Sequence, residues 1–348
     1  MPTFRTVEVT EILAERQGLQ RVRVEGAPVG DRAYCLTELT GTVAVGDRVV
    51  VNTTAVELGL GTGGWHVVHW NLSHDTVQHP GPDHIMKLRY TSLQFDAGTD
   101  ELAHPDLPET LDGTVVVATM VHSQLAAVAA VLKHLEPDLR VGYVMTDGAA
   151  LPIALSDLVA DLRTRGLIDV TVTTGHAFGG DLEAVSVPSG LLLARHVGDA
   201  DILLAGMGPG VVGTGTRYGT TAVEVAPILD AADALGGEPV LCIRASSGDH
   251  RDRHLGISHH TRTVLDLLGC RPWVPAGSMD SEGGAARRLE VDAPDTVALL
   301  AELGLAVTTM GRLPEQDRLF FDTAGAVAAV ALRLRAMRQP RSVDRLDT

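Results

Sequence analysis

Cysteine, lysine and aromatic residues are scarce in this chain of 348 residues. The three cysteines, Cys35, Cys242 and Cys270, are far apart, and no two have the spacing of a metal-binding or redox pair. An odd number of isolated cysteines argues against a disulfide framework and against a structural zinc site. We therefore expect a cytoplasmic protein.

Positive charge is also scarce, because the formal net charge is −16 at pH 7. Such a charge argues against general attraction to nucleic acid or to an anionic membrane, although it leaves room for a local basic site. No apolar run approaches the roughly 20 residues that cross a bilayer, and the first residues lack the features of a secretion signal. We therefore expect neither a nucleic-acid partner nor a membrane partner.

The first part of the chain is rich in short β-type segments. Runs such as VEVTEIL, DRVVVN and WHVVHW contain β-branched residues and are separated by glycine, proline and aspartate turns. This pattern predicts a small β-barrel or β-sandwich over residues 1–97. Residues 98–113 are acidic and interrupted by glycine and proline, which is typical of a linker.

From residue 114 onward, apolar strands alternate with helical segments. The run TVVVATMV precedes a helix that Ser123 is expected to cap, and a later strand precedes a helix that Ser156 is expected to cap. Repeated β-α-β units predict a parallel sheet with helices on both faces. The fold class is therefore α/β, with a Rossmann-like domain over residues 114–348.

The segment RASSGDHRDRHLGISHHT, residues 244–261, holds four histidines, three arginines and two aspartates. It lies between a predicted strand and a helix that Ser258 is expected to cap, and ligands bind at such strand ends in α/β proteins. His259 and His260 fall in the first helical turn, where the helix dipole disfavours a protonated imidazole. Arg251 and Arg253 could clamp an anion.

We expect His259 or His260 to act as a general base, with Asp249 and His254 as further catalytic candidates. The alternative is a solvated, charged loop whose two histidines begin a helix.

A second segment, GMGPGVVGTGTRYGTT, contains six glycines at residues 206–221 and follows a predicted strand. Its formal GxGxxG match is weak, because further glycines continue where a dinucleotide-binding helix should begin, and no lysine completes a P-loop. Exposed backbone N–H groups and hydroxyls could instead form an anion nest. The alternative is an ordered connection between sheet and helix. The expected ligand-binding residues of this segment are Gly208, Gly210, Gly213, Thr214, Gly215, Thr216 and Arg217.

Two further loops and one histidine are weaker candidates. Asp147 follows one predicted strand, and His176 and Asp181 follow another beside paired glycines. These three side chains are the expected ligands if a divalent metal is bound, and routine turn residues otherwise. Among the N-terminal histidines, His66 is retained as a ligand-binding candidate between the domains.

Several phrases of the chain are long and distinctive, among them GLGTGGWH, MTDGAALP, GHAFGGDLEAV, GMGPGVVGTGT and RHLGISHHT. Together they resemble a bacterial family known only as a domain of unknown function. The resemblance covers nearly the whole chain. It implies that the phrases belong to one inherited unit, but it implies no reaction, cofactor or substrate.

The leading functional hypothesis is an enzyme, a hydrolase or transferase, acting on a phosphorylated or otherwise anionic small molecule such as a nucleotide. A second hypothesis is a ligand-sensing or assembly module without turnover. A nicotinamide-dependent oxidoreductase is a third, and it is poorer because Asp230 and Asp233 fall in a helix instead of closing a strand after the glycines. A homodimer is the default assembly for such a protein.

Overall fold

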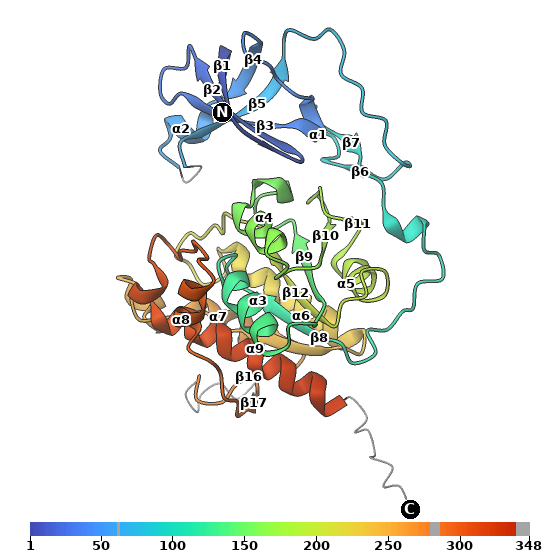
Figure 1. The fold of residues 1–348 in the computed structure, drawn as a ribbon, viewed down its shortest axis with the longest axis vertical. Coiled ribbons are helices and arrows are strands. Elements are labelled where there is room, and N and C mark those ends of the chain that lie inside the picture. Colours follow the sequence, from blue (N-terminus) through green and yellow to red (C-terminus); the bar gives the residue numbers. More distant parts are fainter. Residues whose placement is uncertain (61–62, 279–285, 339–348) are drawn as a thin grey trace, which may run out of the picture. The chain divides into compact units, whose positions relative to one another are not determined.

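The computed structural model describes residues 1–60, 63–278 and 286–338, and the chain divides into two compact units, Met1–Gly98 and Thr99–Thr348 (Figure 1). Residues 99–113, most of the segment predicted as a linker, cluster with the second unit. There Asp100 accepts a hydrogen bond from the backbone N–H of Glu183 at 2.7 Å. The expected domain lengths therefore differ slightly from the observed units.

The first unit is a closed barrel of five strands in the order β1-β2-β3-β5-β4. β3 and β5 are parallel, and the other neighbours are antiparallel. The prediction of a barrel or sandwich is thus resolved as a barrel. The elements are β1 (Phe4–Arg16), β2 (Leu19–Glu25), β3 (Arg32–Leu36), α1 (Thr37–Thr40), β4 (Arg48–Asn52), α2 (Thr54–Glu57), β5 (Trp65–Asn71), β6 (Met86–Lys87) and β7 (Phe95–Asp96).

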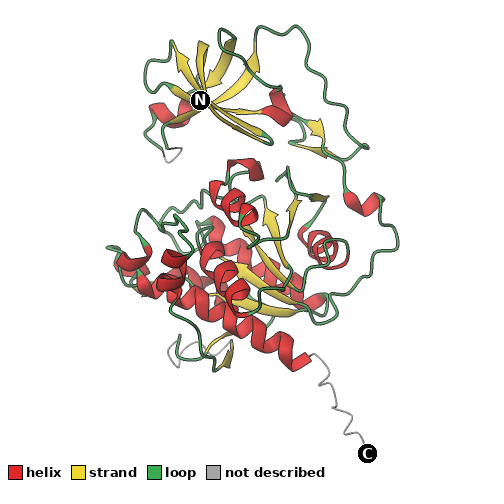
Figure 2. Ribbon diagram, in the orientation of Figure 1, coloured by secondary structure: helices red, strands yellow, loops and turns green. Residues whose placement is uncertain are grey.

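The second unit is built on an eight-stranded parallel sheet in the order β11-β10-β9-β12-β8-β13-β16-β17 (Figure 2). This confirms the predicted Rossmann-like α/β arrangement. The central strands are buried on both faces, which explains their continuous apolar sequences. The strands are β8 (Val115–Thr119), β9 (Val141–Thr146), β10 (Val170–Thr174), β11 (Leu182–Ala184), β12 (Ile202–Met207), β13 (Glu238–Cys242), β16 (Trp273–Pro275) and β17 (Arg287–Leu289).

Helices cover both faces of this sheet. α3 packs against α4, α8 and α9, while α6 packs against α5 and α7. Among the described residues, none of the helices combines the length and apolar character needed to cross a membrane. The helices are α3 (Gln124–Leu135), α4 (Asp157–Thr164), α5 (Val187–His196), α6 (Val225–Ala234), α7 (His259–Leu267), α8 (Thr296–Glu302) and α9 (Arg318–Arg338). Shorter elements are η1 (Asp100–Leu102), η2 (Ile153–Leu155), η3 (Thr221–Glu224), β14 (Ala245–Ser246), η4 (Asp252–His254), β15 (Gly256–Ile257) and η5 (Pro314–Gln316).

The two predicted serine caps have different outcomes. Ser156 accepts a hydrogen bond from the backbone N–H of Val159 and caps α4 as predicted. Ser123 precedes α3, but its own backbone is already helical and its side chain makes no cap. The side-chain oxygen of Gln124 instead accepts hydrogen bonds from the backbone N–H groups of Met120 and Val121. The prediction that Ser123 caps the helix was therefore wrong, because the longer side chain of Gln124 accepts the hydrogen bonds of the preceding backbone N–H groups.

The direction in which the chain moves across the sheet changes near the middle of the sheet. β8 and β12 are neighbours, but after β8 the chain continues to β9, on the side of β10 and β11, whereas after β12 it continues to β13, on the side of β16 and β17. Ligands of open α/β sheets bind at such a point, outside the carboxyl ends of the strands. The glycine-rich segment follows β12, and the histidine-rich segment follows β13, on the other side of β8. Both are thus placed at the position where a ligand is expected.

Gly206→Ala is expected to lower the free energy of unfolding by about 1 to 3 kcal/mol, because the added methyl group overpacks a central strand. A Cβ at Gly206 would lie 2.6 Å from the backbone oxygen of Thr119 on β8, which cannot move away easily. Gly213→Ala is the control, since its nearest neighbour would be at an ordinary 3.6 Å. Denaturant unfolding measures both variants, and equal stabilities would contradict the expected close packing.

Candidate functional site

The structure brings the glycine-rich and histidine-rich segments together around one cavity of about 180 Å³, which is called the anion cavity here because arginine and histidine side chains line it. Its polar lining is mostly basic, and no carboxylate side chain is among the lining residues. The lining residues are Val211, Val212, Gly213, Gly215, Thr220, Arg244, Arg251, Arg253, His254, His260 and Met310.

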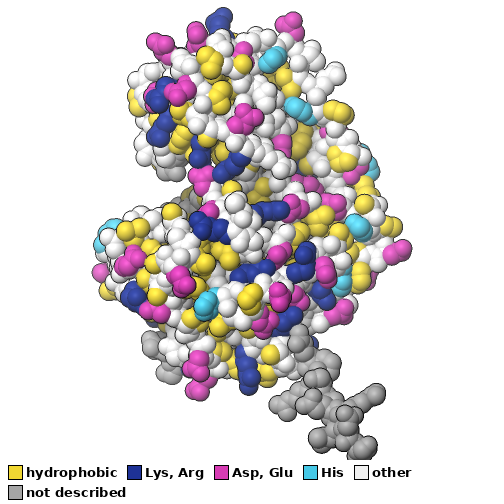
Figure 3. Space-filling model, in the orientation of Figure 1, with side chains coloured by type: hydrophobic (Ala, Val, Ile, Leu, Met, Phe, Trp, Pro, Cys, Tyr) yellow, Lys and Arg dark blue, Asp and Glu magenta, His cyan; other side chains and the backbone are white. Residues whose placement is uncertain are grey.

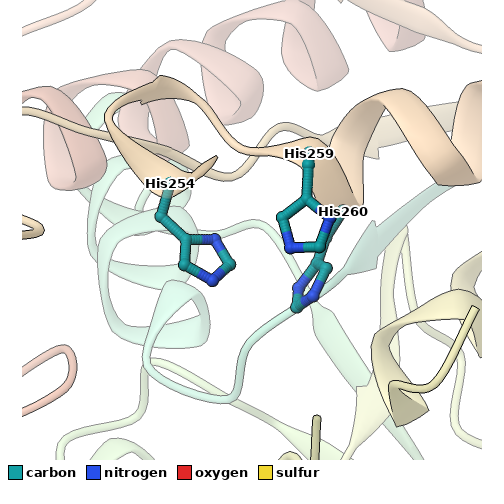
Figure 4. A group of neighbouring side chains, drawn as sticks. All are labelled: His254, His259 and His260. Atoms are coloured by element: carbon teal, nitrogen blue, oxygen red, sulfur yellow. The ribbon is translucent and has the colours of Figure 1, made fainter. Parts of the chain in front are cut away.

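Three histidines cluster at this cavity. His254 ends η4, and His259 and His260 begin α7, so that all three rings lie close together (Figure 4). One ring nitrogen of each lies within 4.8 Å of the others, and ring centroids are 4.2 to 4.9 Å apart. His254 and His260 are buried and line the cavity, whereas His259 does not line it.

Ser258 positions the cluster through its place at the beginning of α7. Its hydroxyl accepts a hydrogen bond from the backbone N–H of His260 at 3.2 Å, which confirms the predicted cap. The same oxygen lies 2.8 Å from Nδ1 of His254. β14 and β15 pair at the base of the loop and hold its two ends together. The hydroxyl therefore fixes the ring of His254 relative to the first turn of the helix that carries His260.

Arg244 determines the protonation pattern of His260. This arginine is only 4% exposed, and its Nη1 donates a hydrogen bond to Nδ1 of His260 at 3.1 Å. Because a guanidinium has no acceptor, Nδ1 must be unprotonated and the neutral ring must carry its proton on Nε2. His260 thus contributes an N–H donor and no free lone pair.

The cluster is held in its neutral form at physiological pH. Burial is the largest cause and the nearby positive charge of Arg244 is the next, and together with other neighbouring charges they lower the pKa of His260 to about 3 and that of His254 to about 4. Burial also lowers the pKa of His259, with Arg253 the next cause. Arg244 itself has its pKa lowered to about 10 by burial and stays charged at neutral pH. The expectation of neutral histidines thus agrees with the surroundings of the rings.

Two buried carboxylates orient the arginines behind the cavity. Asp249 accepts hydrogen bonds from Nε and Nη2 of Arg251 at 2.8 and 2.7 Å, and Arg312 Nη2 lies 3.5 Å from it. These bonds to Arg251 hold the pKa of Asp249 well below its usual range. Asp317 pairs with Arg312 and accepts from the hydroxyl of Ser246 at 2.6 Å. Asp249, predicted as a catalytic group, is engaged in ion pairs with arginines.

The donor set fits an anion better than a metal cation. Three histidines could in principle hold Zn²⁺, which needs ring nitrogens with free lone pairs about 2.0 to 2.1 Å from the ion. Nε2 of His260 carries a proton, however, and Arg244, Arg251 and Arg253 raise the local positive potential. A divalent cation would require His260 to lose that proton beside three guanidinium groups. The lining side chains therefore suit an anion better than a divalent cation.

Acid is expected to destabilise the protein through these rings. An unfolded histidine has a pKa of about 6.5, so between that pH and about 4 the unfolded chain binds more protons than the folded chain. The free energy of unfolding should therefore fall as pH falls through this window. Above about pH 6.5 these rings are neutral in both states, so they should not make the free energy of unfolding depend on pH.

Thermal unfolding of His260→Asn measures this effect. Asn can still accept from Arg244 but cannot titrate, so the slope of stability against pH should become shallower. His134→Asn, at the end of α3, is the control. An unchanged slope in His260→Asn would contradict the account.

The glycine-rich segment contributes only part of what was predicted. Gly213 and Gly215 line the anion cavity, whereas Gly208, Gly210, Thr214, Thr216 and Arg217 are not among its lining residues. The hydroxyls of Thr214 and Thr216 lie 2.9 Å apart and fold the loop on itself. Arg217 forms an exposed ion pair with Asp266.

The remaining candidates lie elsewhere in the structure. Asp147 is exposed and accepts from the backbone N–H of His176 at 3.0 Å. Asp181 pairs with Arg163 and accepts from the backbone N–H of Thr171 at 2.9 Å.

Among the described residues, only His254, His259 and His260 lie close enough together to share a metal ion. The predicted metal ligands Asp147, His176 and Asp181 are not part of this group.

His66 is buried in the first unit, where its Nε2 lies 2.9 Å from the backbone oxygen of Val29.

Sequence reasoning missed several residues around the cavity. Arg244, Thr220 and Met310 line it, and Arg312 lies behind it, but only Arg244 carried a signal, its position at the end of a predicted strand. Glu224 was also missed. Its carboxyl group bonds to Thr146 at the end of β9, and burial raises its pKa to about 7.

The fold and the site define a two-unit protein, a small β-barrel joined to a Rossmann-like α/β unit with a basic cavity at the carboxyl edge of its sheet. The chain belongs to the family described as "Protein of unknown function (DUF3866)", whose model matches residues 32–328. The resemblance expected from the sequence is thereby confirmed. Neither a curated protein nor a solved structure matches this chain.

Proposed function

We propose that this protein binds a phosphorylated or otherwise anionic small molecule in the anion cavity and acts on it as a hydrolase or transferase. One observation carries the proposal: three arginines and two histidines line the cavity without a carboxylate among them. Guanidinium groups match the geometry of phosphate and carboxylate oxygens, and their charge draws anions into a concave site.

The charged side chains around the cavity favour the binding of an anion. Arg244, Arg251, Arg253 and Arg312 carry four positive charges, and Asp249 and Asp317 carry two negative charges, which leaves a surplus of two. Arg253 is exposed and has no hydrogen-bond or ion-pair partner among the described residues. It is therefore the guanidinium that is free to close on a ligand. The other arginines are held in place by carboxylates before the ligand arrives.

The size of the cavity limits what it can enclose. Pockets for whole small molecules measure about 300 to 1,000 Å³, so a cavity of about 180 Å³ fits the anionic end of a ligand. A phosphate group with its attached ester oxygen is of this kind. The rest of a larger ligand, such as a nucleoside, would extend past the exposed residues Val212 and Gly215 of the glycine-rich segment.

The two histidines that line the cavity can contribute in different ways. The N–H on Nε2 of His260 can donate a hydrogen bond to a phosphate or leaving-group oxygen. His254 can donate from Nδ1 to the Ser258 hydroxyl, which leaves its Nε2 lone pair to accept a proton from water or an alcohol. A hydrogen-bond donor and a neutral base beside bound phosphate suit phosphoryl or acyl transfer.

A thermal-shift screen tests the binding step, using inorganic phosphate, nucleotides, sugar phosphates, carboxylates and divalent metals with and without chelator. A ligand at about 100 times its Kd adds about 2.7 kcal/mol, which raises the Tm by several degrees. We expect stabilisation by a class of phosphorylated compound, independent of chelator. Stabilisation by metal alone would contradict the assignment of the cavity to an anion.

Product analysis then separates the enzyme from a ligand-sensing or assembly module. Incubation of the purified protein with the stabilising compound should consume it and release a product. Tight binding without any product would favour the sensing module and reject the catalytic part of the proposal.

A further inference from the structure

The outer face of the barrel carries two stacked aromatic rings with arginines beside them. β2, β3 and β5 are neighbours, and the registers place Arg21 opposite Tyr34 and Arg32 opposite Trp65. The alternate residues of these strands, such as Val22, are buried in the barrel. Arg21, Arg32, Tyr34 and Trp65 therefore share the outward face of three adjacent strands, here called the aromatic face.

The aromatic rings are not part of the barrel core. The core of the first unit is aliphatic, consisting of eight valines with Ala33 and Cys35. Among the described residues of this unit no aromatic side chain is buried, although the whole chain has only 3% aromatic residues. The placement of Tyr34 and Trp65 is thus not explained by packing inside the barrel.

The geometry of the aromatic face is that of a stacking platform. The rings of Tyr34 and Trp65 are stacked, with centroids 4.8 Å apart and planes at 16°. The guanidinium of Arg32 lies 4.6 Å from the centre of the Trp65 ring, and that of Arg21 lies 5.5 Å from it. Val67 continues the face and is 36% exposed. The aromatic face therefore combines two planar aromatic rings with planar guanidinium groups.

We propose that the aromatic face binds single-stranded nucleic acid, independently of the anion cavity and in contrast to the expectation drawn from the net charge of the whole chain. Unpaired bases stack on aromatic rings and on guanidinium planes, and the arginine charges attract the phosphates between the bases. Some five-stranded barrels bind oligonucleotides and oligosaccharides on the face of their second and third strands, where Arg21, Arg32 and Tyr34 lie here. The arginines favour the oligonucleotide, because a neutral sugar gains nothing from their charge.

The local charge sets how strong this binding should be. The chain carries a net charge of −16, and Arg23 on the same strands is neutralised by Glu11 and Asp31. On the face seen in Figure 3, acidic and basic side chains are interspersed over the molecule. Arg32 would thus contact about one phosphate, so the logarithm of the affinity should fall against the logarithm of the salt concentration with a slope of about −0.7.

Fluorescence anisotropy of the full-length protein with labelled oligothymidylate and oligouridylate tests the proposal. Trp65→Ala should weaken binding about 5- to 150-fold, the range for loss of one stacked base. Arg32→Gln, which leaves the rings in place, should weaken binding and reduce the salt slope. Tyr90→Ala and Arg48→Ala are the controls, because both residues are exposed in the same unit away from the aromatic face.

Each outcome of this experiment is informative. Binding that is weaker in both aromatic-face variants and unchanged in the controls supports the proposal, and the two oligomers distinguish DNA from RNA. Tighter binding to duplex than to single strands, no binding at low salt, or equal affinities for all variants would overturn it. Binding of an uncharged oligosaccharide in place of the oligonucleotides would also overturn it.

Discussion

Asp249→Asn is expected to lower the free energy of unfolding by about 3 to 5 kcal/mol, because removing one partner of a buried ion pair leaves the other charge uncompensated. The carboxylate is buried and lies among Arg244, Arg251 and Arg312, at 3.9, 2.7 and 3.5 Å. Without its charge, the buried guanidinium of Arg244 has no other ion-pair partner among the described residues. Urea unfolding followed by circular dichroism measures the change.

Asp266→Asn is the matched control for this variant. Asp266 pairs with Arg217 on the surface, with more than half of each side chain exposed. Exposed ion pairs contribute about 0 to 1 kcal/mol, so this variant should be close to the wild type. If the two variants lose the same stability, the carboxylate does not hold the arginines as described.

Arg253→Ala is expected to weaken binding of inorganic phosphate about 10- to 150-fold, the loss of one charge-assisted hydrogen bond of about 1.5 to 3 kcal/mol. Arg253 lines the anion cavity, and its guanidinium has no ion-pair partner among the described residues, so the folded protein should keep its stability. Calorimetric titration measures the affinity, and thermal unfolding without ligand checks the stability.

Arg262→Ala provides the control for long-range charge. Arg262 is exposed on α7 and does not line the cavity, so its removal changes the net charge equally. A loss of affinity as large as that of Arg253→Ala would mean that phosphate responds to the overall field of the protein, and that the cavity does not bind it.

The general fold could be predicted because its signals are local. Buried parallel strands have continuous apolar sequences, such as ILLAGM in β12. Ser156 and Ser258 cap the first turns of helices, as expected. Barrel and sandwich could not be distinguished, because alternation shows which residues face inward but not whether β1 pairs with β4. That pairing joins residues that are 40 to 48 positions apart in the sequence.

The anion cavity could be predicted only in part for the same reason. The glycine-rich and histidine-rich segments were each predicted to bind a ligand, and the structure places His254, His260, Arg251 and Arg253 around one cavity with Gly213 and Gly215. Strand order decides which loops meet, and the sequence does not reveal it. Arg217 illustrates the limit, since it pairs with an aspartate 49 residues away.

The most direct test of the central claim is the response of individual histidine rings to inorganic phosphate, followed by nitrogen-15 NMR of labelled protein. Phosphate in the anion cavity should move the ring resonances of His254 and His260 and raise their pKa, because a nearby anion favours the protonated ring. His134 and His196, at the far ends of α3 and α5, should not respond. Resonances of His254 and His260 that stay in place while phosphate binds, or equal movement of all four, would contradict the claim that this cavity binds an anion.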